Sequence, residues 1–252
     1  MTQAALFNLS ELAIFLSFLF SLFKKTGALS KLFLALYLPL SFGYVIVRYH
    51  RAVPMTPTFF GTLLSLPFLG LLGALALRKK KDGTNLALHR ALVGFIFLLG
   101  LSQIFFPKDF YLPFLKTANF FSHCHLILAA LGKAYFFLSG LWALDYLLKF
   151  DGGEERSPSG FLKFQVLGFC CWTLSIFSGE VWTYLGWGLP VVWEDPAVVT
   201  FLATWFFYLG AMHLRFWKGA THQLAAKASA LGLIWLIAVN SIADFGPARF
   251  IL

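Results

Sequence analysis

Apolar residues gather along the chain into eight blocks, most of them close to the length that crosses a lipid bilayer. A helix rises 1.5 Å per residue, so about 20 residues span a hydrocarbon layer about 30 Å thick. Backbone exposed to lipid must satisfy its own hydrogen bonds, and each block is therefore predicted to form a helix. The predicted helices are Ala4–Phe23, Leu29–Val47, Thr58–Leu77, Ala91–Phe106, His125–Leu148, Phe164–Trp182, Ala197–Trp217 and Ala228–Phe245.

The connections between these blocks are short and rich in polar or turn-forming residues, such as KKTGALSK, RKKKDGTN, DGGEERSPSG and KGATHQ. The chain contains no internal repeat and no linker long enough to separate domains. Of the 252 residues, 59% are hydrophobic and only 12% are charged, whereas globular proteins carry about 25% charged residues. We predict one all-α domain over residues 1–252, a polytopic membrane bundle of about eight transmembrane helices.

The first block is predicted to be a retained helix and not a cleavable signal peptide. The leader MTQAALFN has no positive charge, and Lys24 and Lys25 follow the apolar block instead of preceding it. This order favours an N-terminus on the extracytoplasmic side of the membrane.

Basic residues are distributed unequally between the two sides of the predicted bundle. Fourteen of the twenty lie in connections on one side and five lie on the other, with Lys133 inside the fifth helix. Cytoplasmic loops carry the excess of Lys and Arg, so we predict that the richer side is cytoplasmic and that both termini are extracytoplasmic. The net charge of +9 follows from this topology and indicates no nucleic-acid partner. The fourteen residues are Lys24, Lys25, Lys31, Arg78, Lys79, Lys80, Lys81, Arg90, Lys149, Arg156, Lys163, Arg215, Lys218 and Lys227.

The stretch SGEVWTYLGWGLPVVWEDP after the sixth block has no basic residue and is predicted to be an external loop. Three of the eight tryptophans, Trp182, Trp187 and Trp193, lie in it within twelve residues, among glycines, prolines and acids. Two interpretations stay open at this point. The residues form either an interfacial aromatic belt or an apolar platform that stacks a large planar ligand, with Asp195 at its polar edge.

The second half of the chain carries the spaced residues Gly179-Glu-Val-Trp182, Trp187-Gly188, Trp193-Glu-Asp195-Pro196, Thr204-Trp205, Tyr208 and His213-Leu-Arg215. This set resembles the tryptophan-rich, WWD-type motif of the haem-handling cytochrome c assembly proteins. These proteins are the CcsA/ResC group, with CcmC, CcmF and HemX-type relatives. Val191 stands where the family's middle tryptophan belongs, and one extra residue interrupts the WDP sequence. The resemblance is strongest over residues 125–240.

The resemblance implies haem b as substrate or bound ligand, and it singles out two histidines. His125, at the start of a leucine-rich segment, resembles the family's ligand to haem at the outer face. His213 resembles a ligand to a second haem within the membrane, whose opposite ligand comes from a partner subunit. Neutral imidazole is the usual axial donor to haem iron. The alternatives are an ordinary interfacial histidine at 125 and a snorkelling residue beside Arg215 at 213.

Three further residues are weaker candidates for contact with haem. His50 lies between Arg48 and Arg51, a cationic spot that could receive propionates. His123 could supply a second axial nitrogen, and Lys133, two turns inward of His125, could neutralise a propionate.

Other polar residues receive no haem role from the sequence. His89 and His222 stand beside basic loop residues and are expected to be solvated. Glu11, in the first block, has no evident partner.

One departure from the family concerns a second external histidine after the last helix. The equivalent position falls in Ala243–Pro247, which contains no histidine. His123, His50, a partner or an incoming apocytochrome would have to replace it, or the chain would serve as a HemX-like accessory protein.

The resemblance as a whole implies a protein of cytochrome c biogenesis that holds haem at the extracytoplasmic face of a bacterial plasma membrane. The implied partners are a ResB/CcsB-type membrane protein and apocytochrome c. The sequence contains no self-contained catalytic motif, and any enzymatic role would belong to a haem lyase or synthase complex. Two alternatives from other classes are a b-type cytochrome subunit and a small-solute transporter.

Overall fold

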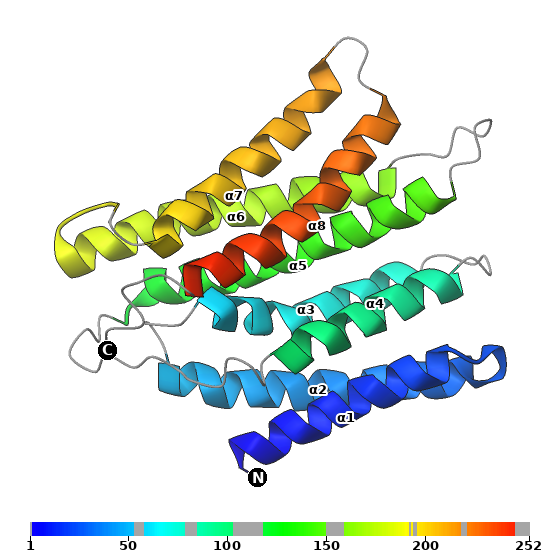
Figure 1. Ribbon diagram of the computed structural model, residues 1–252. Helices are drawn as coiled ribbons and strands as arrows, with labels where there is room; N and C mark the ends of the chain where they lie inside the picture. Colours follow the sequence, from blue (N-terminus) through cyan, green and yellow to red (C-terminus); the bar gives the residue numbers. More distant parts are fainter. Residues whose placement is uncertain are drawn as a thin grey trace. The chain divides into compact units, whose positions relative to one another are not determined.

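The computed structural model describes residues 2–52, 58–78, 85–102, 118–149, 159–191, 193, 196–217 and 221–244. These ranges contain eight α-helices and two short 3-10 turns, and no strand. The prediction of an all-α helical chain is confirmed (Figure 1). The elements are α1 (Gln3–Ser21), η1 (Lys24–Thr26), α2 (Gly27–Ala52), α3 (Thr58–Arg78), α4 (Asn85–Leu101), α5 (Phe120–Leu148), α6 (Ser159–Trp187), α7 (Pro196–His213), η4 (Leu214–Phe216) and α8 (His222–Asp244).

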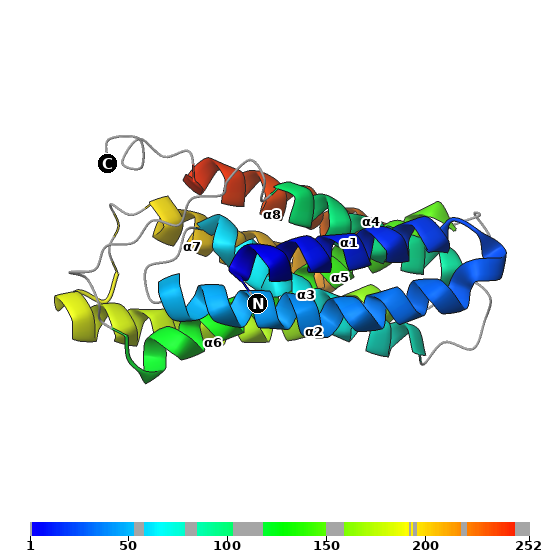
Figure 2. The same ribbon diagram turned by 90° about the horizontal axis from the view of Figure 1, so that it is seen from below.

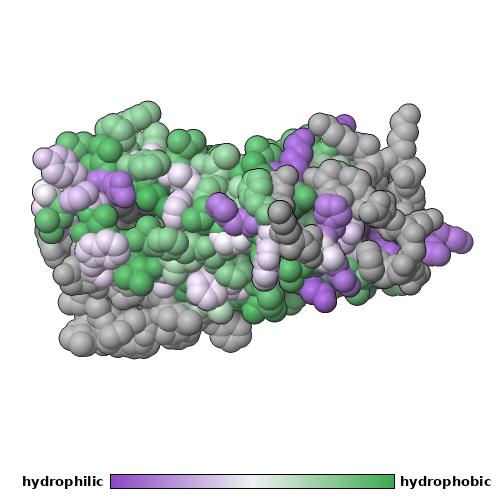
Figure 3. Space-filling view, turned by 90° about the horizontal axis from the view of Figure 1, so that it is seen from above, coloured by the Kyte–Doolittle hydropathy of each residue, from purple (hydrophilic) through white to green (hydrophobic). Residues whose placement is uncertain are grey.

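Six helices in the described ranges are long and apolar enough to cross a membrane, and α4 and α7 add two shorter apolar helices. Large apolar side chains stand exposed along these helices, including Leu98, Phe206 and Ile234, each more than 60% exposed. In Figure 3, apolar side chains cover the middle of the face drawn, and hydrophilic ones gather mainly towards its right-hand end. Such surfaces suit lipid, so the chain is an integral membrane protein of polytopic, helical type.

Several helices extend beyond the predicted blocks, whereas α1 and α7 end two and four residues before the predicted Phe23 and Trp217. α6 extends the predicted block 164–182 by five residues at each end, and α2 continues past Val47 to Ala52. The fourth helix begins six residues earlier than predicted. Apolar length measures only the part of a helix that lies in lipid, whereas the backbone continues into the interface until a capping or turn residue ends it. Beyond the ends of α1 and α7, the chain continues into the short 3-10 turns η1 and η4.

The described residues divide into two compact units. The N-terminal unit comprises residues Met1–Thr56 and Leu63–Phe114, and the C-terminal unit comprises Pro57–Thr62 and Leu115–Leu252. The first therefore contains α1, α2, α4 and most of α3, and the second contains α5 to α8.

In the N-terminal unit, α1 packs along α2 through small polar residues (Figure 2). The Ser17 hydroxyl donates to the backbone oxygen of Ser30 (2.8 Å), and the Ser30 hydroxyl lies 2.7 Å from the backbone oxygen of Ser17. Small residues allow close approach of helices in lipid, and their hydroxyls bond across the interface.

His89 joins this seam from α4, because its Nε2 lies 2.7 Å from the Ser30 hydroxyl. It is only 6% exposed, so the expectation of a solvated histidine is wrong. The physical reason lies in the next residue: Arg90 donates to the backbone oxygens of Ser21 (2.5 Å) and Leu22 (3.0 Å). Arg90 thus satisfies the free carbonyls at the end of α1, and α4 begins early enough to carry His89 inside.

In the C-terminal unit, α5 packs against both α6 and α8. Asn119 caps its first turn by accepting from the Ser122 amide (3.0 Å), and the Ser122 hydroxyl accepts from the Asn119 amide (3.1 Å). This reciprocal pair starts the helix at Phe120, ahead of the predicted His125. Of the most apolar stretch of α5, 78% is buried, compared with 28% for α6, so α5 is the central helix.

Candidate functional site

His125 lies in the second turn of α5 and is held by α6 of the same unit. Its ring Nδ1 lies 2.9 Å from the backbone oxygen of Ser175 and 3.1 Å from the Ser175 hydroxyl. The same hydroxyl donates to the backbone oxygen of His125 (2.7 Å). One serine therefore fixes both the main chain and the ring of the histidine.

These contacts define which ring nitrogen carries the proton. A carbonyl oxygen only accepts hydrogen bonds, and the Ser175 hydroxyl has given its proton to the His125 carbonyl, so Nδ1 must be the donor. In the neutral ring the lone pair then resides on Nε2. No hydrogen bond of Nε2 is recorded among the described residues. The half-buried imidazole is thus in the form that ligates a metal through Nε2, with its other nitrogen held by a carbonyl.

The close seat of the ring on α6 depends on Gly179. A Cβ at this position would lie 2.7 Å from Nδ1 of His125, a distance that real side chains do not adopt. Phe201 of α7 and Trp182 of α6 complete the surroundings, with ring centroids 5.2 Å and 5.9 Å from the imidazole. Three helices therefore orient this histidine.

The three tryptophans of the motif differ in exposure, and Trp182 is the one that contacts His125. Trp182 is 9% exposed and meets Trp187 edge to face, with centroids 5.7 Å apart and planes at 68°. Trp187 is 37% exposed and Trp193 is 64% exposed. Trp182 is thus a packing residue that links the histidine to Trp187, while Trp187 and Trp193 present their rings outward.

The prediction that Trp187 lies in a loop is wrong, because α6 continues past the predicted end at Trp182 to Trp187. Gly188 ends the helix with φ of 74°, a left-handed conformation that glycine adopts without steric cost. Its amide still donates to the backbone oxygen of Tyr184 (2.9 Å). The Thr183 hydroxyl then donates to the backbone oxygen of Pro190 (2.6 Å), which ties the following loop back onto α6.

His213 lies at the C-terminal end of α7 and is exposed. Its Nδ1 donates to the backbone oxygen of Leu209 (2.8 Å), which again leaves the lone pair on Nε2. Phe201, which contacts His125, stands twelve residues earlier on α7, about 18 Å along the helix axis. His125 and His213 therefore lie at opposite ends of the unit and cannot ligate one iron.

The three weaker candidates for contact with haem differ in position and exposure. Lys133 is buried (4% exposed) two turns along α5 from His125. His123 is half-buried in the first turn of α5. His50 is exposed near the end of α2 in the N-terminal unit, where its ring meets Tyr49 at 6.4 Å. Their contacts with haem stay predictions.

The cationic spot around His50 is smaller than the sequence indicates. Arg48 is 3% exposed and donates to the Tyr44 hydroxyl (2.6 Å), so it belongs to the interior of the N-terminal unit. The side chain of Arg51 lies outside the described residues, as do Asp195 and the segment 245–252.

Part of the sequence motif serves helix packing. The Trp205 indole donates to the Thr173 hydroxyl (2.9 Å), and the Trp235 indole donates to the Thr204 hydroxyl (3.3 Å). Tyr208 stacks on Phe136 with a centroid distance of 3.5 Å. The Thr-Trp and Tyr positions of the motif thus join α7 to its neighbours and lie away from the histidine.

Sequence reasoning missed Ser175 and Phe201 and assigned no role to Gly179. A signal for two of them is present in the spacing: Ser175, Gly179 and Trp182 recur at i, i+4 and i+7, one face of a helix. A small-residue face of this kind marks a helix contact in membranes. The spacing does not indicate which residue of another helix, here His125 of α5, contacts this face.

Comparison with known proteins agrees with this architecture. The family described as "Cytochrome C assembly protein" matches residues 5–243, which cover both units. The chain is 36% identical over 73 residues to the cytochrome c biogenesis protein CcsA of Welwitschia mirabilis, 28% of this chain and 24% of the relative. It is 39% identical over 72 residues to CcsA of Cyanidium caldarium (29% and 24%). It is 33% identical over 90 residues to CcsA of Prochlorococcus marinus strain MIT 9312 (36% and 28%).

The matched segment spans about a quarter of the length of these curated relatives. The family match, by contrast, extends over nearly the whole chain and includes α1 to α8. The membrane-helical fold, the spaced tryptophans and the family match point in the same direction, and the chain belongs to the cytochrome c assembly protein family.

Proposed function

We propose that this protein binds haem where α5 begins and α6 ends, and presents it for attachment to an apocytochrome c. The observation that carries the proposal is the His125 imidazole, whose Nδ1–H is held by Ser175 and whose Nε2 lone pair is available. Trp182 lies beside this ring and contacts Trp187, and the side chains of Trp187 and Trp193 are exposed. Membership of the cytochrome c assembly protein family supports haem as the substrate.

Each residue has a distinct part in this proposal. His125 donates Nε2 to the iron, and the Ser175 carbonyl orients the ring. Trp187 and Trp193 cover the apolar face of the macrocycle, and Asp195 orients its polar edge. The haem itself supplies the vinyl groups to which cysteine thiols of the apocytochrome add. This chain binds, orients and shields, and it forms no covalent bond.

The partners follow from the same proposal. One axial position is filled by His125, and the segment 243–247 offers no second external histidine. The opposite position is then open to a histidine of the incoming apocytochrome or of a ResB/CcsB-type subunit. His213, with its own free Nε2, is proposed as the ligand of a second haem at the cytoplasmic end.

The b-type cytochrome alternative loses support in the C-terminal unit. That class of protein needs two histidines facing each other across one haem. Phe201, which contacts His125, stands about 18 Å along the axis of α7 from His213, so the two candidate histidines do not face each other.

The absorption spectrum of the detergent-purified protein tests the proposal. Protein from haem-replete cells is expected to show a Soret band, and His125→Ala is expected to lower haem content or shift the band. His222→Ala, an exposed residue at the start of α8, is the matched control and should change neither. An unchanged spectrum and haem stoichiometry in His125→Ala would remove it as a ligand. The yield of covalent cytochrome c in the same cells separates presentation from accessory haem storage.

A further inference from the structure

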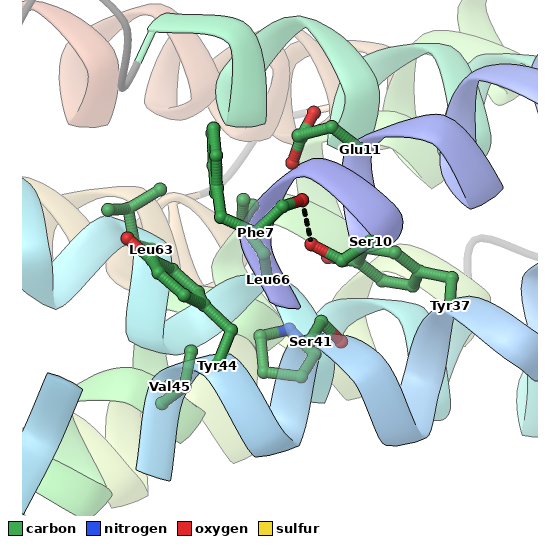
Figure 4. Close-up of a pocket in the computed structure, with 10 residues that line it drawn as sticks. Phe7, Ser10, Glu11, Tyr37, Ser41, Tyr44, Val45, Leu63 and Leu66 are labelled. Carbon is green, nitrogen blue, oxygen red and sulfur yellow. Dashed lines mark hydrogen bonds between the residues drawn. The ribbon is translucent and has the colours of Figure 1, made fainter. Parts of the chain in front are cut away.

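Glu11 is a membrane-helix carboxylate that the proposed haem function does not use. It lies in the middle of α1 and projects towards α4, as Figure 4 shows. A Cβ at Gly100 of α4 would lie 2.6 Å from Oε2 of Glu11, so the carboxyl rests directly on the glycine backbone. Only glycine at position 100 leaves room for it.

The carboxyl has no compensating partner in the described part of the chain. Oε2 is buried and makes no hydrogen bond, and no ion pair of Glu11 is recorded. Burying an ionised carboxylate without a partner costs far more than burying a neutral acid, so the group takes up a proton instead. Asp145 provides the contrast, because it is paired with Lys149 at the end of α5.

Nearby hydroxyls do not solvate Glu11, although several line its pocket. The Ser10 hydroxyl donates to the backbone oxygen of Phe7 (2.8 Å), and the Ser41 hydroxyl donates to that of Leu38 (3.1 Å). The Tyr44 hydroxyl accepts from Arg48 (2.6 Å). The two serine hydroxyls have therefore given their protons to backbone oxygens, and no hydrogen bond from the Tyr44 hydroxyl to Glu11 is recorded.

Two further sides of the pocket come from α2 and α3. The titratable groups that face Glu11 are Tyr37 and Tyr44 of α2, whereas α3 contributes only the apolar residues Leu63, Leu66 and Pro67. The cavity measures about 10 Å³, at the lower limit of the space that one water molecule needs. The cavity therefore holds at most about one water molecule while this contact is closed.

We propose that Glu11 is a proton-binding site, a carboxylic acid that keeps its proton at neutral pH while α1 is closed against α4 at Gly100. Opening of this contact admits water, and the acid then releases its proton to solvent. Closing therefore binds one proton, and by linkage a rising pH favours the open contact. The proton ligand and the helix contact are coupled in the N-terminal unit alone, independently of haem at His125.

Infrared difference spectroscopy of the purified protein tests the protonation state. Wild type minus Glu11→Gln at neutral pH is expected to show the carbonyl band of a protonated carboxylic acid, which shifts in D2O. Glutamine keeps the size of the side chain and removes only the acid. Carboxylate bands in that difference spectrum, with no protonated band, would overturn the proposal.

Thermal unfolding in detergent tests the coupling to the helix contact. As the pH rises above about 4, where glutamate in an unfolded chain releases its proton, the wild type should lose stability, and Glu11→Gln should lose less, because it has no proton to release. In the infrared measurement, Gly100→Ala should replace the band of the protonated acid by carboxylate bands, since the added methyl group displaces the carboxyl. Gly210→Ala, where a Cβ meets no atom within 4 Å, is the control. Equal pH dependence in wild type and Glu11→Gln would contradict the coupling.

Discussion

The ring of His125 and the backbone of Ser175 are joined by a 2.9 Å hydrogen bond from Nδ1 to the carbonyl oxygen, and the Ser175 hydroxyl donates back to the His125 carbonyl. The pair connects α5 to α6, 50 residues apart in sequence. A carbonyl partner of this kind selects the tautomer and the orientation of a metal-binding imidazole. Helix packing therefore sets the orientation of the His125 ring.

Gly179→Ala tests the role of that orientation. The new methyl group would lie 2.7 Å from Nδ1, so the ring must leave its seat on α6. We expect a loss of haem content comparable with that of His125→Ala, and a destabilisation of about 1–3 kcal/mol from overpacking. Haem content and thermal unfolding measure the two effects, with Gly210→Ala as the control. Normal haem content in a folded Gly179→Ala protein would show that the ring position is unimportant.

The tryptophans distinguish a ligand platform from an interfacial belt. At Trp187 and Trp193, phenylalanine should preserve either role in part, whereas alanine should remove about 1–3 kcal/mol of aromatic contact per ring from a platform. Asp195→Asn should weaken haem handling without affecting insertion, because it removes charge and almost no apolar area. Haem content and cytochrome c yield, normalised to inserted protein, are the measurements. Wild-type values for all three variants would favour the belt.

Tyr208→Phe is expected to stabilise the protein. The side chain is fully buried, and its hydroxyl has no hydrogen-bond partner among the described residues. An unsatisfied buried hydroxyl opposes folding, so its removal should raise the free energy of unfolding by about 1 kcal/mol. Tyr184→Phe, at a residue 61% exposed, should change nothing. A lower melting temperature for Tyr208→Phe would mean that the hydroxyl has a partner.

The membrane topology has its own test. The asymmetry of fourteen against five basic residues places Gly152 on the cytoplasmic side and Gly188 outside. Single cysteines introduced at these two positions, in a background without Cys124, Cys170 and Cys171, should react with an impermeant thiol reagent from opposite sides. Labelling of both from one side would refute the predicted orientation.

Several features of the protein were determined by the sequence alone. Block length in residues set the number and approximate places of the helices, because the cost of exposing polar backbone to lipid depends on local composition only. The spacing of the tryptophans and histidines indicated the correct family, because a family motif is defined by residue types and spacings along the chain. Helix ends were less accurate, because caps such as Asn119 and Gly188 stand outside the apolar stretches.

The tertiary structure decided how individual side chains are used. By sequence His89 was expected to be solvated, yet it bonds the buried Ser30, whereas His125 is held by Ser175 through Nδ1 and leaves Nε2 available. The sequence does not distinguish the roles of Gly179 and Gly100. The packing shows that Gly179 leaves room for the His125 imidazole and Gly100 for the Glu11 carboxyl. The physical reason is that apolar burial in lipid is satisfied by many helix rotations. Only the close fit between particular small and polar residues of neighbouring helices selects one rotation, and that fit is absent from the order of residues along any single helix.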